Sequence, residues 1–430
     1  MSLSDPYAAL RLRDFRCYLA SSMLGILGFQ VQILAVRYEI FGRTDDYMSL
    51  GWMGLLMTLP AFLLTLPAGQ IADWFDRRIV IACALAMAAV GSIGLYLISI
   101  YHGPLWMVYA SILLRATAAT FTQPARGALL PQIVPGDNFA NAITWNSSIM
   151  QTALMVGPAL GGFIAARSIP AAYLTDAACM ILSLGCIAAI NHRLPAKPRQ
   201  PATVQTVMAG MRYVFTTKII LATLTLDLMA TIFGGAVALL PGFSKNILHV
   251  GAEGLGWLNA APAAGAVAMS GLLAHFGPLK NAGRALIIAV IGFGAATALF
   301  GVSTSFPLSL FLLFLTGAFD NISVVVRHTL VMALAPEEMR GRIAAVNSLF
   351  IGASNRLSDF ESGVTAKLWG PVASVVFGGV GSIVSVVAAT IKWPELRHIG
   401  ALEDLRPAVS APSEAAANPA AESNSDAAAR

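Results

Sequence analysis

Ionisable side chains lie inside long apolar segments of this 430-residue sequence. A charge in hydrocarbon is costly, so such residues usually face a cavity or a partner of opposite charge. The histidines are scattered without an HExxH pattern, and the chain has no nucleophile elbow and no GxxxxGK[ST] loop. These residues are therefore suited to proton binding and ion pairing, and nothing indicates an enzyme. The positions are Glu39, Arg115, Asp176, Asp227, Asp320, Arg356, Asp359 and Glu361.

Three of the acids differ in their setting. Asp227 interrupts the apolar stretch TLTLDLMATIF, which suits either a proton carrier or a fixed partner for an arginine. Asp176 is closer to a membrane face and is predicted to be structural. Asp320 shares a helix face with Arg327, seven residues later, so the two either line a cavity or lock their helix to its neighbours.

The last acids lie on one predicted helix. Asp359 and Glu361 are two residues apart, so they point about 200° away from each other and cannot form a dyad. Arg356 lies three residues before Asp359, which favours an ion pair on one face. We therefore predict a structural pair of Arg356 with Asp359, and a functional acid in Glu361. Glu39, Arg115, Asp227 and Asp320 are the further candidates for proton coupling or for lining a cavity.

Composition indicates the elements that hold these residues. Hydrophobic residues make up 57% of the chain and charged residues 11%, whereas soluble domains carry roughly 25% charged residues. A helix of about 20 apolar residues crosses a bilayer. The chain is therefore predicted to be an all-α membrane protein of twelve spans. They lie near 17–41, 48–70, 79–100, 105–125, 140–166, 171–190, 219–244, 254–275, 285–303, 307–327, 343–366 and 371–391.

Lysine and arginine are concentrated in alternate connections, which predicts the orientation. With the N-terminus inside, the outward loops hold only Arg43, Arg167, Lys245 and Lys367. Both termini are then cytoplasmic, in a multi-pass protein of the inner membrane. The net charge of +5 is spread between apolar segments, so no nucleic-acid partner is expected. The four cysteines lack metal-ligand spacing, and no metal site is predicted.

An internal repeat divides the chain into halves. Arg126, Pro135, Asn146 and Ser147 recur as Arg327, Pro336, Asn347 and Ser348 at the same spacing. We predict two pseudo-symmetric six-helix bundles, 1–190 and 219–392, with the substrate between them near the midplane. Residues 191–218 are predicted to be a cytoplasmic linker with an amphipathic helix. Residues 393–430 are predicted to be a disordered cytoplasmic tail.

Two motifs carry a family resemblance. Gly69–Arg78 reads GQIADWFDRR, in which Asp73, Asp76, Arg77 and Arg78 can form a charge cluster at the helix ends, while Gly69 allows close helix approach. This loop resembles the signature loop of the major facilitator superfamily. Gly157, Pro158, Gly161 and Gly162 lie in GPALGG, which resembles the motif of the superfamily's antiporter branch; a kink for helix packing is the alternative.

Further stretches resemble one branch of that superfamily, the one that includes the enterobactin (siderophore) exporter. They are PARGALLPQIVP at 124–135, PEEMRGRIAAVNSLFIGASN at 336–355 and DFESG at 359–363. The chain departs from the branch at Arg356, where an acidic residue is usual, and in having Arg37 beside Glu39. Both departures bear on substrate charge and on proton coupling.

The resemblance implies alternating access with the proton-motive force as driving energy and no cofactor. The predicted function is proton-coupled export of a small metabolite such as a siderophore, by a monomer with lipid, substrate and protons as partners. Broad multidrug efflux is the alternative. A non-transporting receptor or scaffold is a third possibility, but it would not need costly acids inside the membrane.

Overall fold

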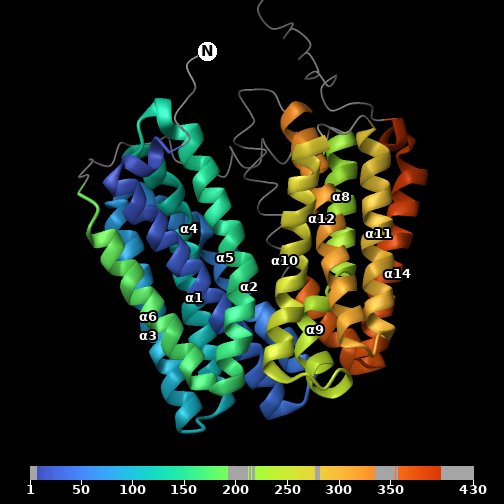
Figure 1. The fold of residues 1–430 in the computed structure, drawn as a ribbon, viewed down its shortest axis with the longest axis horizontal. Coiled ribbons are helices and arrows are strands. Elements are labelled where there is room, and N and C mark those ends of the chain that lie inside the picture. The colour runs from blue at the N-terminus through green and yellow to red at the C-terminus, as the bar shows by residue number, and fades with distance from the viewer. Residues whose placement is uncertain are drawn as a thin grey trace, which may run out of the picture.

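The computed structural model describes residues 7–191, 212, 215, 218–276, 281–334, 354 and 357–398. This part of the chain is helical throughout, with short connections and no strand (Figure 1). Eleven of its helical segments are long and apolar enough to cross a membrane. The all-α membrane fold predicted from composition is confirmed.

The N-terminal half has six long helices joined by short turns. Polar side chains fix three of these turns, because each accepts a hydrogen bond from a backbone N–H in the first turn of the next helix. Asp46 caps the start of α2, Asp76 that of α3 and Ser168 that of α6. The helices are α1 (Arg13–Thr44), α2 (Tyr47–Trp74), α3 (Arg77–Ile100), α4 (Leu105–Ile133), α5 (Phe139–Arg167) and α6 (Ile169–Ala188).

The C-terminal half repeats this layout. Residues 357–369 are also helical, and they are the described part of the span predicted at 343–366. The linker prediction falls outside the described residues except for Asn191, Arg212, Phe215 and Lys218, and so does most of the predicted tail. The elements are α8 (Lys218–Phe233), α9 (Ala236–Gly242), the π-helix η3 (Phe243–Ile247), α10 (Gly251–Phe276), α11 (Ala282–Val302), α12 (Phe306–Leu334) and α14 (Pro371–Lys392).

The seventh span is broken, where the sequence predicted one helix over 219–244. Helix α8 ends at Phe233, and α9 begins three residues later at Ala236. Helix 357–369 crosses at this break, and a Cβ atom on Gly235 would lie 2.0 Å from the hydroxyl oxygen of Ser362. Ser358 donates a hydrogen bond to the carbonyl of Ile232, 3.2 Å away. The crossing helix thus takes over a backbone group that the interruption leaves without its helical partner.

The two halves lie side by side (Figure 1). We call the end with the α1–α2 turn the outer end, following the orientation predicted from the basic loops, and the end with the α2–α3 turn the inner end. Toward the outer end, a single hydrophobic core contains residues of both halves, among them Val36, Tyr173, Leu239 and Phe300. Helix α5 packs along α10 and joins the halves.

Toward the inner end the described residues form separate cores. One belongs to the N-terminal half and includes Phe15 and Ile81. The other belongs to the C-terminal half and includes Leu286 and Leu330. Within the described ranges the halves therefore share apolar packing at the outer end only.

Candidate transport site

A cavity of about 360 Å³ opens within the C-terminal half. This volume is within the range of small-molecule sites, roughly 300–1,000 Å³. Helices α8, α9, α10, α11, α12 and 357–369 line the cavity, and α1 of the other half reaches it through one residue, Arg37. The ionisable residues in its lining are Arg37, Asp227, Asp320 and Asp359.

Arg37 and Asp359 form an ion pair that bridges the halves. The Nη2 of Arg37 donates to the Oδ2 of Asp359 at 3.1 Å, and the side chains are 16% and 15% exposed. Arg356, the partner predicted for Asp359, lies outside the described residues, so that pair stays a prediction. The partner that the structure does describe is 322 residues away in the chain, and sequence spacing could not have identified it.

Asp227 is paired with Arg327, which fastens α8 to α12. Both residues are buried, at 7% exposure each. Arg327 also donates from Nε to the carbonyl of Ser323 at 3.2 Å, and Thr231 donates to Asp227 at 3.3 Å. Of the two roles left open for Asp227, this geometry favours a fixed ion-pair partner, and the role itself stays a prediction. The pair joins the helix of Arg327 to α8.

Asp320 lies on the same helix, α12, but its carboxylate is exposed to the cavity. Within the described part of the chain it has neither a hydrogen bond nor an ion pair. Glu361 is half-buried and accepts a weak hydrogen bond from Ser362 at 3.4 Å. Glu361 is not among the residues that line this cavity. The two acids therefore occupy different environments, and the role of each stays a prediction.

The N-terminal half holds a buried polar cluster around Asp176. Ser92 donates to its Oδ2 at 2.5 Å, and Gln32 donates to Ser92 at 3.1 Å. The Nε of Arg115 lies 3.9 Å from the same carboxylate oxygen, and its guanidinium stands over the ring of Phe29 at 5.2 Å. Asp176 is fully buried. A carboxylate held in this way supports the structural role that was predicted for it, and it places Arg115 with Asp176.

Glu39 belongs to a further cluster toward the outer end. It accepts hydrogen bonds from Ser99 at 3.0 Å and from the hydroxyl of Tyr173, and it pairs with Arg43 one turn later. These partners come from α1, α3 and α6, so Glu39 ties three helices together. The structure places it outside the lining of the C-terminal cavity.

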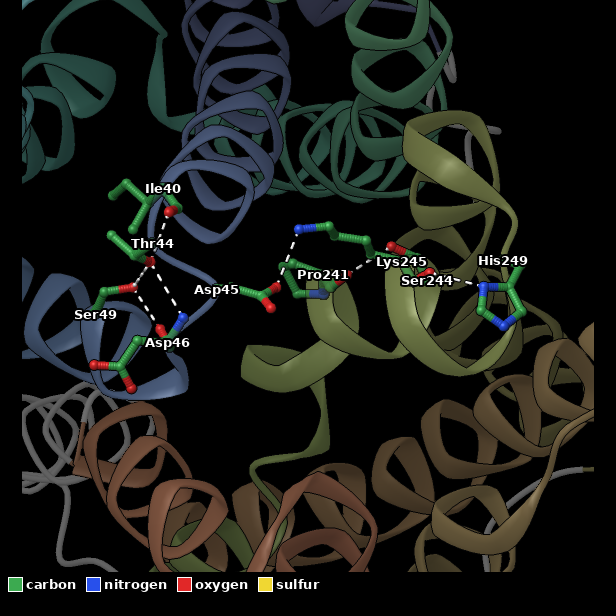
Figure 2. A network of polar contacts seen from close by, with 9 residues as sticks. All are labelled: Ile40, Thr44, Asp45, Asp46, Ser49, Pro241, Ser244, Lys245 and His249. Carbon is green, nitrogen blue, oxygen red and sulfur yellow. Dashed lines mark hydrogen bonds and ion pairs between the residues drawn. The ribbon is translucent and has the colours of Figure 1, made fainter.

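Charged residues of the two halves meet at the outer end (Figure 2). The Nζ of Lys245 lies 3.0 Å from Asp45, and the Nζ of Lys367 lies 3.3 Å from Asp46. Asp45 ends α1 with a φ of 49°, a left-handed conformation that aspartate tolerates. The sequence did not predict these pairs. It shows the two lysines as basic residues of the outward loops, but not which acidic residues of the other half lie beside them.

The glycines of GPALGG lie at close approaches between helices. A Cβ atom on Gly157 would lie 2.6 Å from Gln30, and one on Gly161 would lie 3.0 Å from the Cα of Val31. Gly162 faces Gly256 of α10 across the interface between the halves. A Cβ atom added to Gly162 would lie 2.5 Å from the Cα of Gly256. These residues set how near α5 can come to α1 and to α10. Helix α5 continues through Pro158 to Arg167.

The GQIADWFDRR loop differs from its prediction in two respects. A Cβ atom on Gly69 would meet nothing within 4 Å, so no helix of the described part of the chain approaches closely there. The described residues include no ion pair among Asp73, Asp76, Arg77 and Arg78. Instead Asp76 caps α3, and Arg78 reaches the carbonyl of Ala188 at 3.5 Å. The physical reason for the missing pair is local, because the carboxylate of Asp76 accepts a hydrogen bond from the backbone N–H of Arg78 and the guanidinium of Arg78 is directed to α6.

Comparisons with known proteins agree with this architecture. The family model described as Major Facilitator Superfamily matches residues 18–355. The enterobactin exporter EntS of Escherichia coli (strain K12) is 25% identical over 403 residues, which cover 93% of this chain and 95% of the relative. The enterobactin exporter EntS of Citrobacter koseri matches with the same identity and coverage.

Solved structures share the fold at low sequence identity. A POT family transporter in complex with 5-aminolevulinic acid has a TM-score of 0.73 at 12% identity, covering 89% of this chain and 96% of that one. A bacterial homolog of the human lysosomal transporter Spinster, in an inward-facing and unoccupied conformation, has a TM-score of 0.67 at 14% identity, covering 90% and 96%.

Proposed function

Because the chain belongs to the Major Facilitator Superfamily, we propose that it exports a small metabolite by alternating access of its two halves. The observation that carries this proposal is the asymmetry of packing: the halves share one core at the outer end and have separate cores at the inner end. A substrate could then enter the cavity from the inner end. Rocking of the halves would expose the cavity on the other side.

The contacts between the halves at the outer end are of a kind that can separate. Besides the shared apolar core, they include the glycine contact between α5 and α10, the partly buried pair of Arg37 with Asp359, and two exposed lysine–aspartate pairs. Exposed ion pairs are worth about 0–1 kcal/mol each, so they bias a conformation without fixing it. This supports a molecule that opens and closes at the outer end during each cycle.

We assign proton coupling to Glu361, a half-buried acid whose described hydrogen bonds are local. Its protonation would favour one packing of helix 357–369 and its ionisation the other. The proton-motive force then drives export. In this proposal the protein acts as a monomer without a cofactor, and both of its termini are cytoplasmic. A siderophore is the first candidate substrate, because the curated relatives are enterobactin exporters.

Broad multidrug efflux is the second candidate. Apolar side chains such as Val290, Phe293 and Leu313 share the cavity lining with the charged residues, and such a lining can accept varied apolar compounds.

The test is mass-spectrometric profiling of iron-poor medium and of cell extracts, with and without the gene. A metabolite that falls outside the cells and accumulates inside them in its absence identifies an exporter and its cargo. Complementation with wild-type protein should reverse both changes. Complementation with Gly162→Leu should not, although the matched variant Gly185→Leu should, because a Cβ atom on Gly185 meets nothing within 4 Å.

Unchanged metabolites together with altered sensitivity to dyes or antibiotics would favour multidrug efflux. If neither metabolites nor sensitivity changed, the proposal of export would be wrong.

A further inference from the structure

The charges that line the C-terminal cavity do not cancel. Arg37 is balanced by Asp359 at 3.1 Å, and Asp227 is balanced by Arg327 behind the lining. Asp320 remains, exposed to the cavity and without a charged partner in the described part of the chain. Among the described residues, the lining therefore carries one uncompensated negative charge, on Asp320.

The three threonine hydroxyl groups of the lining reinforce this polarity. Thr297 donates to the carbonyl of Phe293 at 2.8 Å, and Thr316 donates to that of Leu313 at 2.6 Å. Thr231 likewise donates to Asp227. Once its proton is committed to the protein, a hydroxyl offers a ligand only its oxygen lone pairs. These groups therefore accept hydrogen bonds from a ligand and do not donate to it, which disfavours an anion.

An aromatic ring is also available. Phe293 of α11 is half-buried and lines the same cavity as Asp320. A ring face attracts a cation within about 6 Å of its centre, and its apolar surface accommodates the hydrocarbon part of an organic ligand. A carboxylate, lone pairs of hydroxyl oxygens and an aromatic ring form a lining complementary to an organic cation.

From this arrangement we infer that the C-terminal cavity binds the positively charged group of the substrate, such as an amine or a quaternary ammonium, with Asp320 as the residue that determines this specificity. The inference rests on the proposed function, and it narrows the substrate class: the part of the substrate that enters this cavity is cationic. An anionic catecholate is then excluded from this subsite.

The experiment compares two probes of nearly the same size and shape and of opposite charge, tetraphenylphosphonium and tetraphenylborate. Binding of each radiolabelled probe to the full-length protein in lipid nanodiscs is measured by equilibrium dialysis, with empty nanodiscs as the blank. Asp320→Asn removes the charge, and Asp320→Glu retains it. Glu253→Gln is the matched control, because it removes an exposed carboxylate at the start of α10, away from the cavity.

We expect the wild type to bind the cation more tightly than the anion. Asp320→Asn should weaken cation binding at least tenfold, Asp320→Glu should restore most of it, and Glu253→Gln should leave it unchanged. The inference is overturned if the wild type prefers the anion or binds neither probe. It is equally overturned if Asp320→Asn binds the cation as tightly as the wild type does. This holds even if transport by that variant no longer responds to a proton gradient, because Asp320 would then act on protons and not on the substrate.

A failure of this test can be distinguished from a failure of the proposed function. Equilibrium binding measures the charge preference of the cavity, whereas metabolite profiling measures export. An exporter whose cargo is anionic would refute the cation subsite and leave export intact. A protein that prefers the cation but changes no metabolite and no drug sensitivity would have the subsite without the function.

Discussion

Gly162→Ala should open the outer end of this protein. A Cβ atom at this position would lie 2.5 Å from the Cα of Gly256 and 2.7 Å from the carbonyl oxygen of Ala252. Carbon atoms in contact prefer about 3.5–4.0 Å, so α5 and α10 would have to separate by about 1 Å. The clash exists only where these helices touch, and it therefore penalises the closed outer end and not an open one.

The magnitude follows from the cost of overpacking. Inserting a methyl group into a well-packed contact typically costs about 1–3 kcal/mol. At about 2 kcal/mol the ratio of closed to open molecules falls by a factor of about 30. Gly185→Ala on α6 is the matched control, because its Cβ atom meets nothing within 4 Å and it gains the same preference for helix.

The assay is a distance measurement between spin labels at Tyr101 and Val302 in a cysteine-free background. These residues end α3 and α11 at the outer end of the two halves, and they are 78% and 60% exposed. Gly162→Ala should add a longer component to the distance distribution, while Gly185→Ala should match the parent protein. If the two variants gave the same distribution, the glycine contact would not control closure and the reasoning would be wrong.

Three further perturbations test the charged groups. Asp227→Asn should lower the apparent melting temperature, because a buried Arg327 left without its partner costs about 3–5 kcal/mol. Fluorescence-detected size exclusion after heating should show that adding Arg327→Gln to Asp227→Asn restores part of this melting temperature. If the double variant were no more stable than Asp227→Asn, the result would argue against a pair. Glu361→Gln should abolish the dependence of export on a proton gradient in everted vesicles, and an unchanged pH dependence would remove Glu361 from the coupling role. Replacing Lys245 and Lys367 by Gln should open the outer end less than the glycine substitution does, since each exposed pair is worth about 0–1 kcal/mol. In the same distance measurement, 1 M salt should have a comparable effect on the parent protein. A distance distribution that changed with neither the substitutions nor salt would show that these pairs do not hold the outer end closed.

The outer ion pairs and the glycine contact act on the same equilibrium by different physical means. The lysine–aspartate pairs are exposed and therefore screened by salt, whereas the Gly162–Gly256 contact is steric and insensitive to it. Comparing the two kinds of variant at low and high salt separates the electrostatic part of closure from the steric part.

The sequence by itself determined the class of protein and the position of most helices. A membrane-spanning helix is a local feature, because about 20 consecutive apolar residues suffice to form it and its backbone hydrogen bonds are satisfied within the same segment. The GQIADWFDRR and GPALGG motifs supplied the family for the same reason, since each is a contiguous run of residues. The break between α8 and α9 escaped prediction because it depends on a helix that crosses there from elsewhere in the chain.

Only the tertiary structure decided which charges meet. Asp359 contacts Arg37 of the other half, and Asp227 contacts Arg327, because pairing between helices depends on which faces pack together and not on spacing within one helix. Asp320 was one candidate acid among several until the structure gave its neighbours partners and left it exposed to the cavity. A sequence shows that a buried charge needs a partner, whereas the fold determines which residue provides it.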